Sequence, residues 1–146
     1  MMISFDTNIL FPAIDHHTEY HLKARRFLAG YAENETVCIC EQVLMELYCL
    51  IRNPKVCKTP LTPMQAFTVI RGFRSNPHWR VVDVHSDPHF MESIWELSGK
   101  KNFAYRKIFD LRLAKTLQQH QVTDFATRNL KDFQNLGFNR VWDPFL

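Results

Sequence analysis

The sequence predicts an α/β protein of three layers, in which helices cover both faces of a central parallel sheet of about five strands. Short apolar runs alternate along the chain with longer amphipathic segments, and strands separated by helices pair in parallel through right-handed crossovers. Apolar residues make up 46% and charged residues 23% of the chain, which is ordinary for a globular protein. The 146 residues are expected to form one domain, spanning 1–146.

The composition also limits the environment and the partners. No stretch approaches the ~20 apolar residues of a membrane span, and the N-terminus opens into a predicted strand without an export signal. We therefore expect a cytoplasmic protein with no membrane partner. The net charge of +3 permits a nucleic-acid partner without requiring one. The four cysteines lack the spacing of a zinc site, which favours free thiols.

An acid stands at the end of the first predicted strand. Residues Met2 to Phe5 form a short apolar run that ends on Asp6. Thr7 and Asn8 are helix-capping residue types, and they lead into a short predicted helix that ends at Ile14. Because ligands in open α/β sheets bind beyond the carboxyl ends of the strands, Asp6 is a candidate site residue.

The next helix is expected to begin in the polar segment Asp15–Thr18 and to run to about Tyr31, with Leu22 on its inward face. His17 and His21 are then one helical turn apart, a spacing that could bind a metal ion. Since the sequence suggests no further ligand nearby, a solvated helix start is the preferred interpretation.

The remaining elements continue the alternation. Strands are predicted at residues 36–40, 79–84, 122–126 and 140–142. Helices are predicted at residues 41–52, from about 62 onward, at 88–101 and at 108–119. Prolines support two of these boundaries, because Pro54 follows the first of these helices and Pro144 follows the last strand.

Three further acids are candidates for the same site as Asp6. In the predicted helix over 108–119, Asp110 lies in the middle of the stripe that contains Leu113 and Leu117. A buried carboxylate needs a cation, a proton or strong donors, although an acid near a helix start can instead interact with the helix dipole. Glu46 flanks an apolar stripe, a position that is also typical of a solvated residue.

The last acid follows the fourth strand. Asn129 and Asp132 are expected at the same edge of the sheet as Asp6, although this segment is equally a capped helix start. Crowded carboxylates repel one another without a cation, so four acids at one edge predict a metal site. Oxygen ligands alone select a hard ion such as Mg²⁺ or Mn²⁺.

With these residues in view, the sequence resembles the PIN-domain nucleases, in particular the VapC-type ribonuclease toxins of bacterial toxin–antitoxin pairs. The resemblance extends over nearly the whole chain and rests on four segments in the family's order, Phe5–Leu10, Val43–Leu47, Ile108–Ala114 and Ala126–Phe133. It implies a PIN-like fold and Mg²⁺- or Mn²⁺-dependent cleavage of RNA. It also implies a homodimer and a small antitoxin protein that neutralises the enzyme.

The resemblance assigns roles to individual residues. Asp6, Glu46 and Asp110 match the family's first three acids, and Asp132 matches the fourth, which some members place nearer the position of Asn129. These four acids are the expected catalytic and metal-binding residues, with Asp6 and Asp110 as direct ligands of the ion. The expected substrate contacts are Thr7, Asn8, Arg112, Thr127, Arg128 and Asn129. For the two arginines, a solvated surface position is the alternative.

Other families also begin with a strand that ends in Asp. A haloacid-dehalogenase-like phosphatase requires a second Asp two residues later, where this sequence has Asn8. A receiver domain normally carries paired acids before this Asp, and Met1 and Met2 leave no room for them. The alternative from a different class is a non-catalytic PIN-like module that binds RNA or a protein. Metal-dependent turnover that Asp6→Asn abolishes would distinguish the nuclease from that module.

Overall fold

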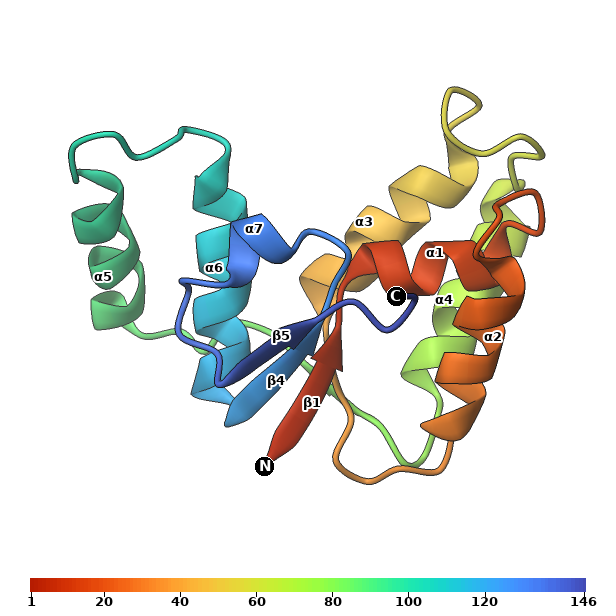
Figure 1. Cartoon of the computed structure of the whole chain (residues 1–146), viewed down its shortest axis with the longest axis horizontal. Coiled ribbons are helices and arrows are strands. Elements are labelled where there is room, and N and C mark those ends of the chain that lie inside the picture. Colours follow the sequence, from red (N-terminus) through yellow and green to blue (C-terminus); the bar gives the residue numbers. More distant parts are fainter.

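The computed structural model describes residues 1–146, with five strands and seven helices (Figure 1). The strands are β1 (Met2–Phe5), β2 (Cys38–Cys40), β3 (Arg80–Val82), β4 (Val122–Ala126) and β5 (Arg140–Trp142). The helices are α1 (Thr7–Ile14), α2 (His21–Gly30), α3 (Glu41–Arg52), α4 (Pro63–Arg74), α5 (Pro88–Ser98), α6 (Lys107–Gln119) and α7 (Leu130–Phe133). No helix combines the length and the apolar character that a membrane crossing needs.

All strand pairs are parallel, but they form two separate ladders. Strands β1, β4 and β5 form a three-stranded sheet in the order β1-β4-β5, and β2 pairs with β3 alone. The two ladders meet at one isolated parallel bridge between Ile3 and Val37. The prediction of one five-stranded sheet is therefore wrong in this detail. The reason is that β2 has only three residues, and the segment before it pairs with β1 through a single bridge.

Helices cover both sides of the strands, as the three-layer prediction requires. Figure 1 shows α5 and α6 on one side and α1, α2 and α4 on the other. On the α2 side, the buried ring of Phe5 meets the rings of Phe27, Tyr31 and Trp79 edge to face, with centroids 5.2, 5.3 and 5.8 Å away. This aromatic cluster fixes the last residue of β1 immediately before Asp6.

Helix α6 contributes to two separate apolar clusters. Leu113 and Leu117 belong to the main core, whereas Leu111 packs with Phe90 and Ile94 of α5. Because the helix is anchored along both of these faces, its first turn is held at the edge of the sheet. That turn carries Asp110.

Helix α2 begins later than predicted. The segment Asp15–Thr18 forms a turn, in which the amide and the hydroxyl of Thr18 both donate to the Asp15 carbonyl, and the helix starts at His21. The predicted helical spacing of His17 and His21 is therefore wrong, because His17 precedes the helix. Helix α5 likewise ends at Ser98, earlier than predicted.

The inward orientation predicted for Leu22 is also wrong. Its residue surface is 66% exposed, because position 22 lies on the opposite face of α2 from the buried Ala24. The helix buries Ala24 instead, and Phe27 and Leu28 pack against the core as expected.

This difference between two leucines gives a matched test of the packing. Leu117→Ala should lower the free energy of unfolding by about 2–5 kcal/mol, because the side chain is fully buried in the main core. Leu22→Ala should change it by less than about 0.5 kcal/mol. Urea denaturation of both variants checks this expectation, and a large effect of Leu22→Ala would contradict the exposed position of that residue.

Candidate active site

Asp6 ends β1 and caps α1. Its Oδ1 accepts a hydrogen bond from the Thr7 amide at 2.8 Å, and its Oδ2 accepts one from the Thr127 hydroxyl at 2.6 Å. Phe5 and Ala126 are register partners in β1 and β4, so the residues that follow these parallel strands meet at one edge. The Asp6 side chain is thereby held in place by one donor on each carboxylate oxygen, and the residue is only 6% exposed.

Glu46 and Asp110 reach the same edge from two helices. The Thr7 hydroxyl donates to Glu46 Oε2 at 3.0 Å, which links the start of α1 to the middle of α3. Asp110 lies in the first turn of α6 and is half-buried. All three acids line one open pocket of about 770 Å³. The sequence prediction that acids far apart in the chain meet at the end of β1 agrees with this arrangement.

Burial and mutual repulsion alter the acidity of two of these groups. Burial, opposed by the hydrogen bonds from Thr127 and Thr7, raises the pKa of Asp6 from 3.8 to about 6, and the charges of Glu46 and Asp110 add to the increase. Burial also raises the pKa of Asp110 to about 6, and the charges of Asp132 and Glu46 contribute. The acids therefore act on one another as a cluster of like charges.

The fourth position of the site is divided between two residues. Asn129 lines the pocket, and its backbone N–H donates to the Thr127 hydroxyl at 3.0 Å. Asp132 is exposed on α7 and does not line the pocket, although its charge raises the pKa of Asp110. Asn129 thus contacts the pocket directly, whereas Asp132 acts on it through its field.

The two arginines differ in their positions. Arg112 lines the acidic pocket, where its Nη1 donates to the Gln42 side chain at 3.1 Å. The guanidinium of Arg128 instead lies 3.9 Å from the centre of the Tyr20 ring, and its Nε lies 3.4 Å from the Asp143 carboxylate. Arg128 lines a neighbouring pocket of about 470 Å³ that shares Asn8 and Asn129 with the acidic one.

Thr7 and Asn8 also line the acidic pocket, but their polar groups are already engaged. Asn8 Oδ1 accepts from the Arg128 amide at 3.1 Å, and its Nδ2 donates to the Thr127 hydroxyl at 3.4 Å. Together with the Thr7 contact to Glu46, these bonds hold α1, α3 and the end of β4 in fixed relation.

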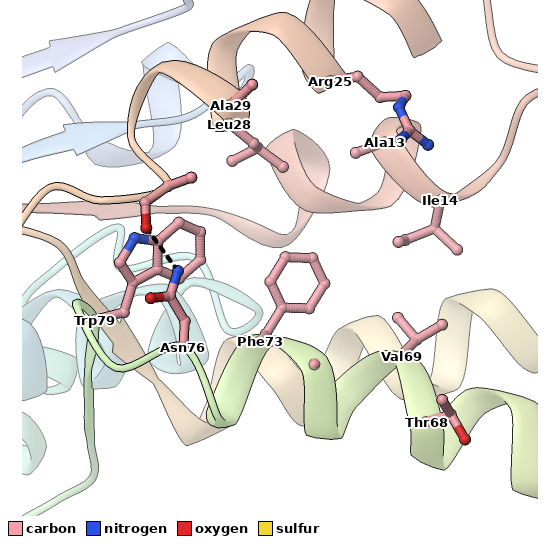
Figure 2. A pocket seen from close by; sticks show the side chains of 12 residues that line it. Ala13, Ile14, Arg25, Leu28, Ala29, Thr68, Val69, Phe73, Asn76 and Trp79 are labelled. Carbon is pink, nitrogen blue, oxygen red and sulfur yellow. Dashed lines mark hydrogen bonds between the residues drawn. The ribbon is translucent and has the colours of Figure 1, made fainter.

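A separate apolar pocket of about 460 Å³ lies between α1, α2 and α4 (Figure 2). It contains none of the acids, and its walls include Leu28, Val69 and Phe73. Of these two pockets, the one at the strand ends gathers the carboxylates.

The sequence matches the PIN domain over residues 3–139. The chain belongs to the PIN-domain family. This PIN domain is 43% identical over 143 residues to Ribonuclease VapC24 from two strains of Mycobacterium tuberculosis, which covers 98% of this chain and 97% of that protein. The family resemblance that the motifs indicate is thereby confirmed.

Solved structures share the fold of this PIN domain at low sequence identity. Mycobacterium tuberculosis VapC20, a toxin that cleaves the sarcin–ricin loop, superimposes with a TM-score of 0.67 at 19% identity over 93% of this chain and 95% of that one. VapBC2 from Rickettsia felis, bound to a promoter DNA fragment, superimposes with a TM-score of 0.60 at 21% identity over 98% of each chain. DNA-bound VapBC from Salmonella typhimurium superimposes with a TM-score of 0.60 at 21% identity, over 99% of this chain and 98% of that one.

Six residues that line the acidic pocket of this PIN domain were not predicted as site residues: Gln42, Met45, Cys49, Leu50, Asp83 and Phe109. Asp83 directly follows β3, so the rule that identified Asp6 applies to it too. It was hidden because the predicted strand ran on to Val84. Met45 and Phe109 are 68% and 65% exposed. Both could have been recognised in the sequence as large apolar side chains on the outer face of a predicted helix.

The donor set of this PIN domain fits a hard divalent cation. Carboxylate oxygens from Asp6, Glu46 and Asp110 converge, and none of the three ion pairs in the protein involves these acids. A bound cation would compensate their repulsion and their desolvation. The carboxylate oxygens of these three acids lie farther apart than the possible ligand atoms of Asp15, His16 and His17 elsewhere in the fold. That group is the one set of three whose ligand atoms all lie within 4.8 Å of one another.

The raised pKa of Asp6 predicts how the metal-free protein responds to pH. Between 3.8 and about 6 the folded protein binds more protons than the unfolded chain, so its stability falls as the pH rises through this window and stays lower above it. Asp6→Asn removes the ionisable group and keeps a helix-capping side chain.

In EDTA, Asp6→Asn should therefore be more stable than the wild type near pH 7.5 by on the order of 1–3 kcal/mol, and the difference should vanish near pH 4. Urea denaturation at the two pH values measures this. Equal stability at both values would mean that ionised Asp6 carries no burial penalty.

Proposed function

We propose that this PIN domain is a metal-dependent endoribonuclease and the toxin of a toxin–antitoxin pair. The observation that carries this proposal is the convergence of Asp6, Glu46 and Asp110 in one pocket, where none of the three forms an ion pair. The 43% identity to Ribonuclease VapC24 along almost the whole chain supports RNA as the substrate. We propose cytoplasmic action, where RNA is accessible.

Mg²⁺ or Mn²⁺ is the proposed cofactor. Asp6 and Asp110 would bind the ion directly, and Glu46 with Asn129 or Asp132 would complete the site directly or through water. A divalent ion held there supplies Lewis-acid activation of the scissile phosphate and lowers the pKa of water.

The protein's own groups would position the reactants. Hydrogen bonds from Thr7 and Thr127 orient both oxygens of Asp6, and the Thr7 hydroxyl positions Glu46. Arg112 offers its charge to a backbone phosphate at the pocket wall, as nucleic-acid-binding proteins commonly do. The exposed ring of Phe109 beside Asp110 suits an unpaired base.

RNA cleavage tests the acid cluster. Purified protein should cleave members of a fluorescent RNA panel with Mn²⁺ or Mg²⁺, and EDTA should abolish cleavage. Asp6→Asn and Asp110→Asn should each reduce the rate by on the order of 100-fold or more, since each removes a charged ligand.

Asp87→Asn is the matched control, because Asp87 caps α5 as Asp6 caps α1 but lies outside the pocket. It should retain full activity. If the wild type and the site variants share the same faint activity, that activity is contamination and the proposal fails. Tight RNA binding without cleavage would favour the non-catalytic module.

The toxin role is tested separately. We propose that a small antitoxin neutralises this homodimeric protein. Expression of the chain alone should arrest growth, Asp110→Asn should relieve the arrest because the metal site is lost, and co-expression of the neighbouring small open reading frame should also relieve it. Growth curves and co-purification measure both effects. Absence of relief by the neighbouring protein would refute the pairing while leaving the nuclease intact.

A further inference from the structure

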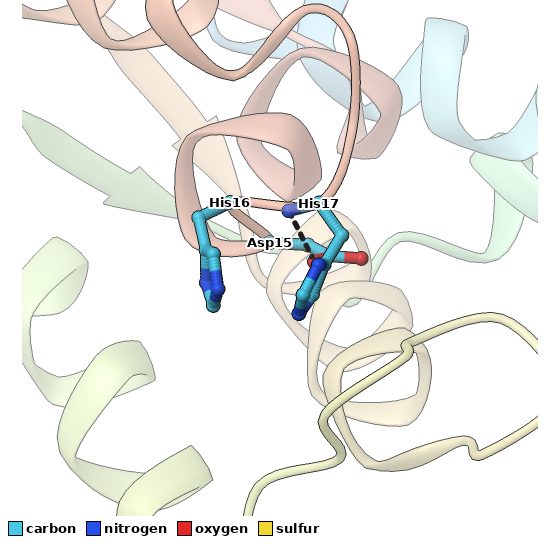
Figure 3. A group of neighbouring side chains, drawn as sticks. All are labelled: Asp15, His16 and His17. Atoms are coloured by element: carbon cyan, nitrogen blue, oxygen red, sulfur yellow. Dashed lines mark hydrogen bonds between the residues drawn. The ribbon is translucent and has the colours of Figure 1, made fainter.

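We infer that the turn between α1 and α2 carries a second metal site, specific for a transition-metal ion such as Zn²⁺. Asp15, His16 and His17 present possible ligand atoms that all lie within 4.8 Å of one another (Figure 3). None of the three lines the acidic pocket, so this group is separate from the proposed active site.

Asp15 is a buried carboxylate that lacks a cationic partner. The residue is 6% exposed, yet its side chain accepts only one hydrogen bond, from the His17 amide at 3.0 Å. None of the ion pairs in the protein includes it. A carboxylate in this position is normally compensated by a positive charge, which a bound cation would supply.

The two neighbouring imidazoles are exposed and lie close together. The ring centroids of His16 and His17 are 4.1 Å apart, and both rings project from the same side of the turn (Figure 3). Ligand atoms of a tetrahedral zinc site lie about 3.4 Å apart. Rotation of these exposed rings can close the remaining gap, while the hydrogen bond at Asp15 holds the carboxylate in place.

His21 lies beside this group and is a candidate fourth ligand, although it is outside the set of three that gathers within 4.8 Å. Its Nδ1 lies 2.7 Å from the Pro12 carbonyl, and because a carbonyl cannot donate, Nδ1 must carry the proton. In the neutral ring the lone pair is then on Nε2. Metal-binding histidines commonly use this arrangement, in which the second ring nitrogen donates to a backbone carbonyl. The rings of His16 and His21 lie 6.4 Å apart, centroid to centroid.

The ligand chemistry distinguishes this site from the acidic pocket. Imidazole nitrogens select Zn²⁺, Co²⁺, Ni²⁺ or Cu²⁺, whereas oxygen-only sites select Mg²⁺ or Mn²⁺. His17 also contacts the Thr59 hydroxyl at 2.9 Å, in the loop after α3. An ion bound at the turn therefore connects the end of α1 to that loop and stabilises the folded state by mass action.

Cobalt titration tests the site. The full chain with Asp6→Asn and Asp110→Asn, which removes the acidic pocket's ligands, is freed of metal and titrated with Co²⁺. Visible absorption reports coordination, and thermal melting reports stabilisation. We expect one equivalent to bind, to be displaced by Zn²⁺ and not by Mg²⁺, and to raise the melting temperature. His16→Asn with His17→Asn should weaken binding by about tenfold or more, and so should Asp15→Asn.

The chain supplies a matched control in a second pair of neighbouring histidines, in which His85 is exposed and His120 is half-buried. The rings of His85 and His120 are 4.6 Å apart and tilted by 35°, close to the 36° of His16 and His17, but they belong to no three-ligand group. His85→Asn with His120→Asn should leave Co²⁺ binding unchanged. The proposal would be overturned if both double variants lost Co²⁺ affinity equally, or if Co²⁺ binding were undiminished in the variant that lacks His16 and His17.

Discussion

The hydrogen bond between Thr127 and Asp6 joins the carboxyl ends of two adjacent parallel strands, and the acidic pocket is assembled around it. Backbone pairing of β1 with β4 brings the two residues together without any contribution from their side chains. The side-chain bond then orients the carboxylate toward the pocket, where helices α3 and α6 add their acids. A change in strand register would separate Asp6 from Thr127 and turn alternate side chains to the opposite face.

The same arrangement explains why the pocket is electrostatically costly. Packing that positions Asp6 also removes water from it, and the neighbouring acids add repulsion. Donors from Thr7 and Thr127 offset part of this cost, but neither carries a charge. The fold thus maintains a preorganised cluster of like charges, a feature that is typical of sites whose ligand supplies the missing charge.

Much of this architecture was predictable from local sequence signals. Strand β4, strand β5 and helix α3 have the predicted bounds because their periodicity is clear and prolines mark two of the ends. The division of the sheet was not predictable, since a three-residue strand carries too weak a pattern to specify its partners. The position of His17 depended on where α2 begins, which a turn at Asp15 decides, and that of Leu22 depended on which face of the helix is buried. Asp83 was missed because the end of β3 was placed too late.

The division of the sheet has a consequence for the distances between the acids in the pocket. Asp6 and Asn129 follow strands of one ladder, while Glu46 and Asp83 follow strands of the other, so the pocket straddles a seam that a single isolated bridge crosses. Backbone pairing alone therefore does not fix the separation of these two groups of pocket residues. The Thr7 contact with Glu46 and the packing of α1 against α3 set that separation. Substitutions in the packing between these helices could therefore change the distance between the acids without replacing any of the acids.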